Sequence, residues 1–286
     1  MFLLKSFEKL STMRNIFLLI LLLTITSVHA QNKASVWVLG TVHFETKGIK
    51  VDSVFNAIET FKPDIILLES DMTNFNSDYS LKNNYNEVEW IVMNRYKKKY
   101  SKTLVRPYEF EGRNQYRKDN GIQNINNVFH KLYEFNQKGQ LTKSQSKTWN
   151  RFMVLVDSLN KVGSKSLSTI NNIETDNLVF ERQFYQYAKA LEIAEKIPYF
   201  SQNFHTTSKG EKITLLERLR RYCEFETLRN KVMADNVLNW TKQHPGKRIV
   251  VFTGFYHKAF LEQYLNWEQK NCNFRLVKYN QVFNEN

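Results

Sequence analysis

The fold is decided by a pattern that occurs twice in the chain. Near the carboxyl end stands "RIVVFTGFYHKAF", residues 248–260, in which apolar residues lead to a glycine and then to His257. Near the beginning stands "SVWVLGTVHFET", residues 35–46, in which apolar residues lead to Gly40 and then to His43. A glycine at the exit of a strand permits a tight turn and a close backbone approach. Each pattern therefore predicts a histidine held just past the end of a buried strand.

The segment after the first pattern predicts a parallel sheet. Apolar residues recur at helical spacing from Val51 to Phe61, and "KPD" then ends the helix before the apolar strand Ile65–Leu68. A strand that is apolar at every position is covered on both faces, which is typical of parallel sheets. Parallel strands need a crossover, and this helix supplies one. We expect an α/β fold with a central, mainly parallel (mixed) sheet and flanking helices.

The rest of the chain predicts further helices and strands around a large helical insertion. We expect helices at 85–100, 214–243 and 258–267, and strands at 103–106, 249–252 and 274–279. Residues 115–200 are rich in Asn, Gln and Lys and show helical patterns, and residues 199–210 read as a loop. The prediction is one α/β domain over residues 31–286, with a helical insertion at about 115–210.

The first thirty residues have the features of a secretory signal peptide. Basic residues precede the short apolar run at residues 16–23, and "SVHA" ends at Ala30 with small residues at the cleavage positions. The alternative is an uncleaved anchor, although the run is short for a membrane span. We expect an exported protein, periplasmic or extracellular, with no stable membrane span after signal cleavage.

The charge of the chain limits the kinds of partner that it could bind, and its cysteines limit the disulfide and metal sites that it could form. The formal net charge is +13, and the densest basic run, "RYKKKYSK" at residues 95–102, ends a predicted helix, where lysines offset the helix dipole. We favour a solvated face and expect no nucleic acid, while a polyanionic envelope surface stays open. Cys223 and Cys272 could pair in an oxidising compartment, and neither belongs to a CxxC metal motif.

Three residues share one predicted place in the fold. His43 follows the first strand, Glu69 ends the second, and His257 follows the strand at 249–252. Ligands of open parallel sheets bind at the carboxyl ends of the strands, so we expect these side chains to converge there. Two imidazoles and a carboxylate could hold a divalent metal such as Mn, Co or Zn. The same trio also suits metal-free acid–base hydrolysis, with one histidine as base and Glu69 orienting it. Either version predicts a hydrolase.

Two further groups are candidates for the same site. The stretch "YEFEGRN" places Glu109, Glu111 and Arg113 at the exit of the third strand, and either glutamate could act as a general base. The stretch "FETLRNKVMADNV" places Glu226, Arg229 and Asn230 on the long predicted helix. Arg229 could bind an anionic group or a developing oxyanion. The remaining candidate is His205 in the polar loop, which could contact the substrate or support another residue of the site.

The ordered set of motifs resembles the superfamily that joins TraB/GumN-type proteins, TIKI metalloproteases, haem-binding ChaN proteins and erythromycin esterases. The likeness rests on "LGTVH", "ILLES", "LRNKVMADNV" and "TGFYH", and it leaves the helical middle uncovered. It implies an exported bacterial branch of that superfamily. For TIKI-like members the two GxxH histidines and the glutamate are linked to metal-dependent peptide hydrolysis, which would fall on His43, Glu69 and His257.

The resemblance also implies alternatives to a metalloprotease. In erythromycin esterases, similar His and Glu residues open a macrolactone without an obligatory metal, so an ester substrate stands beside a peptide. In ChaN-like members the cleft binds haem. The alternative to an enzyme is therefore a protein that binds haem or another ligand in the same cleft, with tyrosines such as Tyr108 and Tyr256 as iron ligands.

Overall fold

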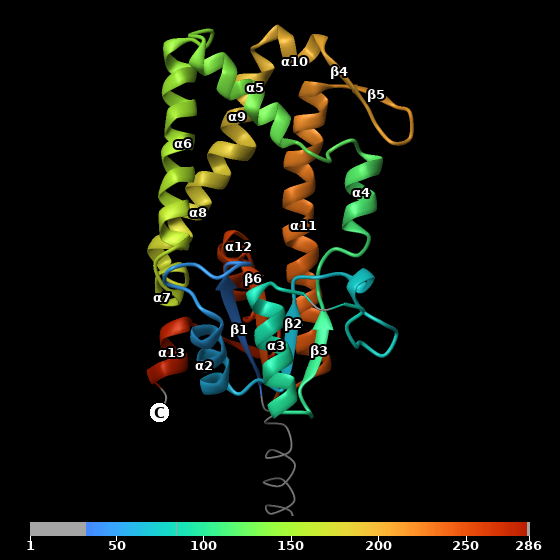
Figure 1. The fold of residues 1–286 in the computed structure, drawn as a ribbon, viewed down its shortest axis with the longest axis vertical. Coiled ribbons are helices and arrows are strands. Elements are labelled where there is room, and N and C mark those ends of the chain that lie inside the picture. The colour runs from blue at the N-terminus through green and yellow to red at the C-terminus, as the bar shows by residue number, and fades with distance from the viewer. Residues whose placement is uncertain (1–32, 84, 285–286) are drawn as a thin grey trace, which may run out of the picture. The chain divides into compact units, whose positions relative to one another are not determined.

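A parallel sheet of five strands forms the centre of the described chain, residues 33–83 and 85–284, in this computed structural model (Figure 1). The strands are β1 (Ala34–Thr41), β2 (Ile65–Leu68), β3 (Leu104–Pro107), β6 (Arg248–Gly254) and β7 (Phe274–Val277). Their order is β3-β2-β6-β1-β7, and every neighbouring pair is parallel. The predicted α/β class is confirmed, with a sheet that is wholly parallel where we expected a mixed one. The predicted signal peptide, residues 1–30, lies outside the described residues.

Strand β6 lies between β1 and β2, although it comes about two hundred residues later in the chain. In the sheet register, Val250 is paired on one side with Trp37 of β1 and on the other with Ile66 of β2. Sequence order suggested that β1 and β2 belong to one βαβ unit, but they are not neighbours in the sheet. This strand order places the carboxyl end of β6 between the carboxyl ends of the two strands that carry the other motifs.

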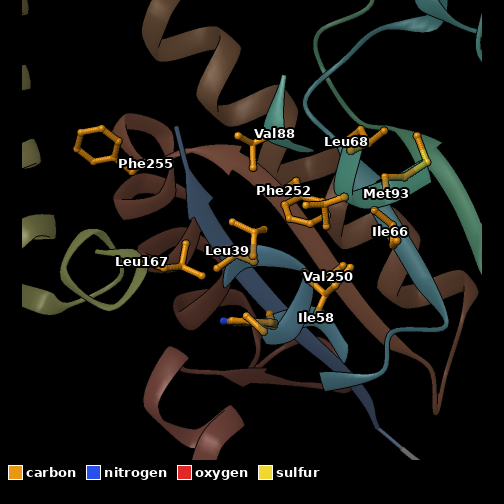
Figure 2. Close-up of a cluster of buried hydrophobic side chains, with 14 of the residues drawn as sticks. Leu39, Ile58, Ile66, Leu68, Val88, Met93, Leu167, Val250, Phe252 and Phe255 are labelled. Carbon is orange, nitrogen blue, oxygen red and sulfur yellow. The ribbon is translucent and has the colours of Figure 1, made fainter. Parts of the chain in front are cut away.

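Helices cover both faces of the sheet. The crossover helix α2 (Val51–Phe61) and α3 (Val88–Lys99) pack on one face, and α11 (Leu215–Gln243) and α12 (Phe255–Glu268) provide much of the packing on the other. Figure 2 shows Leu39, Val250 and Phe252 of the sheet beside helix residues such as Ile58. Because side chains along a strand alternate between the two faces, a strand of apolar residues contributes to the hydrophobic core on each face of the sheet.

The middle of the chain forms the predicted helical insertion. Its segments are α4 (Arg113–Asp119), α5 (Asn126–Gln137), α6 (Lys143–Gly163), α7 (Leu167–Ile170), α8 (Ile173–Phe184), the π-helical η2 (Tyr185–Lys189), α9 (Ala190–Glu195) and α10 (Pro198–Gln202). Residues 199–210 are not a loop as predicted, because α10 extends to Gln202 and an antiparallel hairpin follows, β4 (Phe204–Thr206) and β5 (Lys212–Thr214). Two short segments complete the fold, η1 (Met72–Asn74) and α13 (Tyr279–Asn284).

The long helix α11 joins the insertion to the sheet. The Thr214 side chain caps its start by accepting a hydrogen bond from the N–H of Glu217, at 3.0 Å. Near that start, Leu219 and Phe225 are buried in the core of the insertion, whereas Met233 and Val237 are buried against the sheet. Figure 1 shows α11 running from the insertion down beside the strands. Residues in its middle therefore lie at the carboxyl edge of the sheet.

Two sequence-based expectations concern features outside the sheet. Within residues 33–83 and 85–284, no helix is both long and apolar enough to cross a membrane. Cys223, buried on α11, and Cys272, after α12, are both free thiols in the structure and are not paired with each other.

Candidate functional site

His43, Glu69 and His257 lie together at the carboxyl edge of the sheet. The Nε2 atom of His257 is 3.8 Å from Oε1 of Glu69. A methyl group placed on Gly254 would lie 3.7 Å from Nε2 of His43 and 3.7 Å from Oε2 of Glu69, so these two atoms border the same point. The strand order explains why they meet, because β6, which ends at Gly254 and leads directly into His257 of α12, lies between the strands that precede the other two residues.

The Glu69 carboxylate is held by groups from two other elements. Its Oε2 accepts hydrogen bonds from the N–H of Gly254 at 2.7 Å and from the hydroxyl of Thr253 at 2.8 Å. Its Oε1 accepts one from Nη2 of Arg229 at 2.6 Å. Burial opposes ionisation of Glu69, but the charge of protonated His257, the fixed charge of Arg229 and these donors together outweigh it, and the pKa is lowered to about 2. Glu69 is therefore an anion at neutral pH.

The guanidinium of Arg229 is the centre of the buried part of the site. Its Nε donates to both oxygens of Glu109 at 3.0 Å, its Nη2 reaches Glu69 and Glu109, and its Nη1 lies 2.7 Å from Nε2 of His257. The side chain of Arg229 is only 8% exposed. A planar guanidinium can serve several acceptors at once, and here most of its N–H groups are engaged by these partners. Arg229 acts in this arrangement as a fixed positive charge.

His257, in the first turn of α12, is a neutral imidazole whose tautomer its partners define. Arg229 can only donate, so Nε2 of His257 accepts, and Nδ1 carries the proton that is given to Oδ1 of Asn230 at 2.7 Å. Burial, followed by the adjacent charge of Arg229, lowers the pKa of His257 from 6.5 to about 4. Both ring nitrogens are thus occupied, and the ring is uncharged at neutral pH.

His43 has a different environment and a partner that sequence reasoning missed. Its side chain is 58% exposed, and its Nδ1 lies 3.4 Å from Oε1 of the buried Glu89, at the start of α3. The hydrogen bond and charge of Glu89 raise the pKa of His43 above its ordinary 6.5. With Nδ1 directed at Glu89, the Nε2 of His43 faces the Gly254–Glu69 side of the site. The sequence did carry one signal for Glu89, because it is the charged residue within the otherwise apolar run "VEWIV" at residues 88–92.

The backbone around His43 is fixed from two directions. The carbonyl of His43 accepts a hydrogen bond from the N–H of Val88 at 2.8 Å, which sets α3, and with it Glu89, beside the histidine. At the end of β1, the Asn171 side chain from the insertion accepts from the N–H of Gly40 at 2.8 Å and donates to its carbonyl at 2.9 Å. Asn171 thus replaces a neighbouring strand where β7 no longer extends, and the insertion helps to position His43.

The other predicted carboxylates have anchoring contacts. Glu109 is 3% exposed and is bound by Arg229 and by Nη1 of Arg113, the latter at 2.7 Å. Glu111 accepts from the N–H of Met72 at 3.0 Å, and Oε2 of Glu226 lies 3.8 Å from Arg229. These contacts favour an anchoring role for Glu109 over the predicted role of general base, because a base needs a lone pair that substrate or water can reach.

The residues of the trio fit a metal ion poorly as they are arranged. The lone pairs that an ion would use on Glu69 Oε1 and His257 Nε2 both receive N–H groups of Arg229. Within residues 33–83 and 85–284, no group of three or more His, Cys, Asp or Glu side chains is placed to hold a metal. A metal on His43, Glu69 and His257 would require Arg229 to move, and that metal site stays a prediction.

The remaining candidates lie in other contacts. Tyr108 is buried and donates its hydroxyl to the carbonyl of Phe252 at 3.0 Å, and burial raises its pKa well above the ordinary value. Tyr256 is half-buried, with the guanidinium of Arg182 at 4.8 Å from its ring centre. His205 lies in the β4–β5 hairpin, where burial lowers its pKa. Haem binding through either tyrosine stays a prediction.

Comparison of the chain with protein-family models, with curated proteins and with solved structures finds no match.

Proposed function

We propose that the protein is a hydrolase of ester or peptide bonds in which His43 is the general base. The observation that carries the proposal is the pair formed by exposed His43 and buried Glu89, with the free ring nitrogen of His43 facing Glu69. A carboxylate behind a histidine holds the ring in one tautomer and stabilises the imidazolium that forms during proton transfer. The charge of Glu69 on the other side of the ring favours the same cation.

The chemistry follows from these positions. Neutral His43 takes a proton from a water molecule through Nε2 while the water oxygen attacks the carbonyl carbon of the substrate. The tetrahedral intermediate then collapses, the C–O or C–N bond breaks, and the imidazolium returns its proton to the leaving group. Exposed Phe44, next to His43 in the chain, offers an apolar surface for the substrate. No step in this scheme passes through a metal.

The buried cluster around Arg229 supports the base without touching the substrate. Arg229 keeps Glu69 ionised and lowers the pKa of His257, so the anionic Glu69 lies beside a neutral His257 imidazole at neutral pH. Asn230 and Glu109 in turn hold His257 and Arg229 in place. In this proposal the two GxxH histidines have different tasks, since His43 transfers the proton and His257 stabilises the environment.

The sequence resemblance enters the proposal as support for the reaction class. We place the protein in an exported branch related to TraB, TIKI and erythromycin esterase-like proteins, acting in the periplasm or outside the cell. Among the mechanisms that this resemblance implies, the contacts of Arg229 favour the one without an obligatory metal.

The test compares His43→Ala and Glu89→Gln with the unmodified protein on p-nitrophenyl esters, a macrolactone and fluorogenic peptides, all in EDTA. General base catalysis is worth roughly 10²–10⁴-fold, so His43→Ala should lose at least about a hundredfold in kcat/KM. The matched control is His130→Ala, which removes another exposed histidine paired with a glutamate, 3.1 Å from Glu134 on α5. Full activity of His43→Ala, or equal loss in the control, would contradict the assignment.

The same preparation tests the two alternatives. Activity that EDTA removes and Mn, Co or Zn restores would favour the metal site on His43, Glu69 and His257. A Soret band on haem titration that is lost in Tyr256→Phe, together with no turnover of any substrate, would favour a binding protein.

A further inference from the structure

A second, chemically distinct site lies at the opposite edge of the sheet. A cavity of about 680 Å³ opens where β2, β3 and β6 begin, whereas the candidate hydrolase site lies where strands end. Four strongly basic side chains line it together with two tyrosines: Lys62, Lys102, Lys247, Arg248, Tyr96 and Tyr100. Its volume is in the range of sites that bind small molecules.

The cations of this cavity are mostly unpaired. Asp64 is the carboxylate in its lining, with Oδ1 3.7 Å from Nζ of Lys247 and Oδ2 accepting the backbone N–H of Arg248 at 2.8 Å. The side chains of Lys62, Lys102 and Arg248 form no hydrogen bond or ion pair with any residue of 33–83 or 85–284. Glu59 does not line the cavity; it is bound by Lys99 and by the hydroxyl of Tyr100, at 3.2 Å.

The negative ends of three helix dipoles offset only part of this positive charge. Lys62, Tyr100 and His244 are the residues that cap the carboxyl ends of α2, α3 and α11, and all three line the cavity. Each helix end carries roughly half a negative charge, so three ends and Asp64 amount to roughly two and a half. Four fixed cations exceed that sum, and a net positive field remains in the cavity.

The position of Lys62 also indicates a role for its side chain. Its backbone has φ 53°, in the left-handed region that favours glycine or asparagine after a helix. A lysine there brings no conformational advantage, so the backbone does not explain it. Its amine adds to the charge of the cavity.

We propose that this cavity binds a phosphate group, carried either by a soluble phosphate or by a lipid headgroup. Phosphate offers several oxygens and up to two charges to converging cations, and the planar guanidinium of Arg248 suits two of those oxygens at once. The cavity is large enough for the phosphate and the group attached to it. The proposal does not depend on the hydrolase assignment, because the two sites share no residue.

The test is calorimetric titration of the full chain with pyrophosphate and, separately, with short-chain phosphatidylglycerol below its micelle concentration. The test variant is Lys62→Glu/Lys102→Glu/Arg248→Glu, and thermal unfolding checks its fold. The control is Lys143→Glu/Lys147→Glu/Lys161→Glu, three exposed lysines of α6 that change the net charge equally. Should the reversal variant fail to fold, glutamine at the same three cavity positions replaces it.

Binding of either probe should weaken at least about tenfold in the cavity variant, stay within about twofold in the control, and weaken with added salt. Tighter binding of pyrophosphate would identify the ligand as a soluble phosphate, and tighter binding of phosphatidylglycerol would identify it as a lipid headgroup. The proposal is overturned if neither probe binds, if the cavity variant binds as the unmodified protein does, or if the control loses as much affinity.

Discussion

Replacing Arg229 by methionine tests whether this guanidinium holds the site together. The change removes the positive partner of two buried carboxylates, Glu69 and Glu109, and leaves His257 without its donor. Leaving a buried charge without its partner costs roughly 3–5 kcal/mol. A loss of about 4 kcal/mol corresponds to a fall in Tm of about 8–16 °C for a chain of this size. We expect a loss in that range at pH 7.

The loss should depend on pH in a defined direction. In the unmodified protein the pKa of Glu69 is lowered to about 2, so its stabilisation is present above the unfolded value of 4.5 and disappears as pH falls through 2. Without Arg229, the hydrogen bonds from Gly254 and Thr253 remain but offset less of the effect of burial, so the pKa of this carboxyl is higher than in the unmodified protein. Its contribution to stability is then smaller wherever Glu69 of the unmodified protein is ionised. The difference between the two proteins should therefore appear as pH rises through about 2, be present at pH 4 and be larger at pH 7.

Urea denaturation of both proteins at pH 4 and pH 7 measures this difference. The control is Arg151→Met, which breaks a surface pair with Glu181 of comparable length, 2.7 Å, but with both side chains well exposed. That pair should contribute no more than about 1 kcal/mol. The double variant Arg229→Met/Glu109→Gln should recover part of the loss, because one unpaired charge is gone. A deficit below about 1 kcal/mol, or one equal at both pH values, would refute the reasoning.

Three further predictions follow from the other contacts of the site. Activity should rise with pH through a midpoint above 6.5, since His43 must be neutral to act and Glu89 raises its pKa; Glu89→Gln should lower the His43 midpoint, as followed by NMR of the imidazole. Stability should fall by roughly 3 kcal/mol as pH drops from 6.5 to about 4, because the unfolded chain binds the His257 proton at a higher pH than the folded chain does. The urea midpoint should depend less on pH in His257→Gln, and an unchanged pH dependence in that variant would argue against a buried neutral ring. Asn171→Ala should cost about 1–3 kcal/mol by removing both hydrogen bonds to Gly40, while Asn150→Ala, an exposed amide bonded to Asn136, should cost little.

Local patterns in the sequence were sufficient to locate the elements of the sheet. The helix at Val51–Phe61 and the strand at Ile65–Leu68 have the bounds that periodicity predicted, because apolar spacing reports the face that an element buries. Continuous apolar strands likewise predicted a parallel sheet, and hence a common edge for residues that follow strands. Where the sequence carried no such pattern, as at the β4–β5 hairpin, the prediction was wrong.

Contacts between residues far apart in the sequence were decided by the tertiary structure alone. Nothing local in the sequence says that β6 separates β1 from β2, or that Glu89 lies behind His43, since both depend on how distant segments pack. The same holds for Arg229, whose bonds to Glu69 and His257 span 160 and 28 residues of sequence. The sequence by itself determined which residues could do chemistry and at which edge of the sheet. Only the packing of the chain decided which histidine is exposed with a carboxylate behind it, and which is buried and neutral.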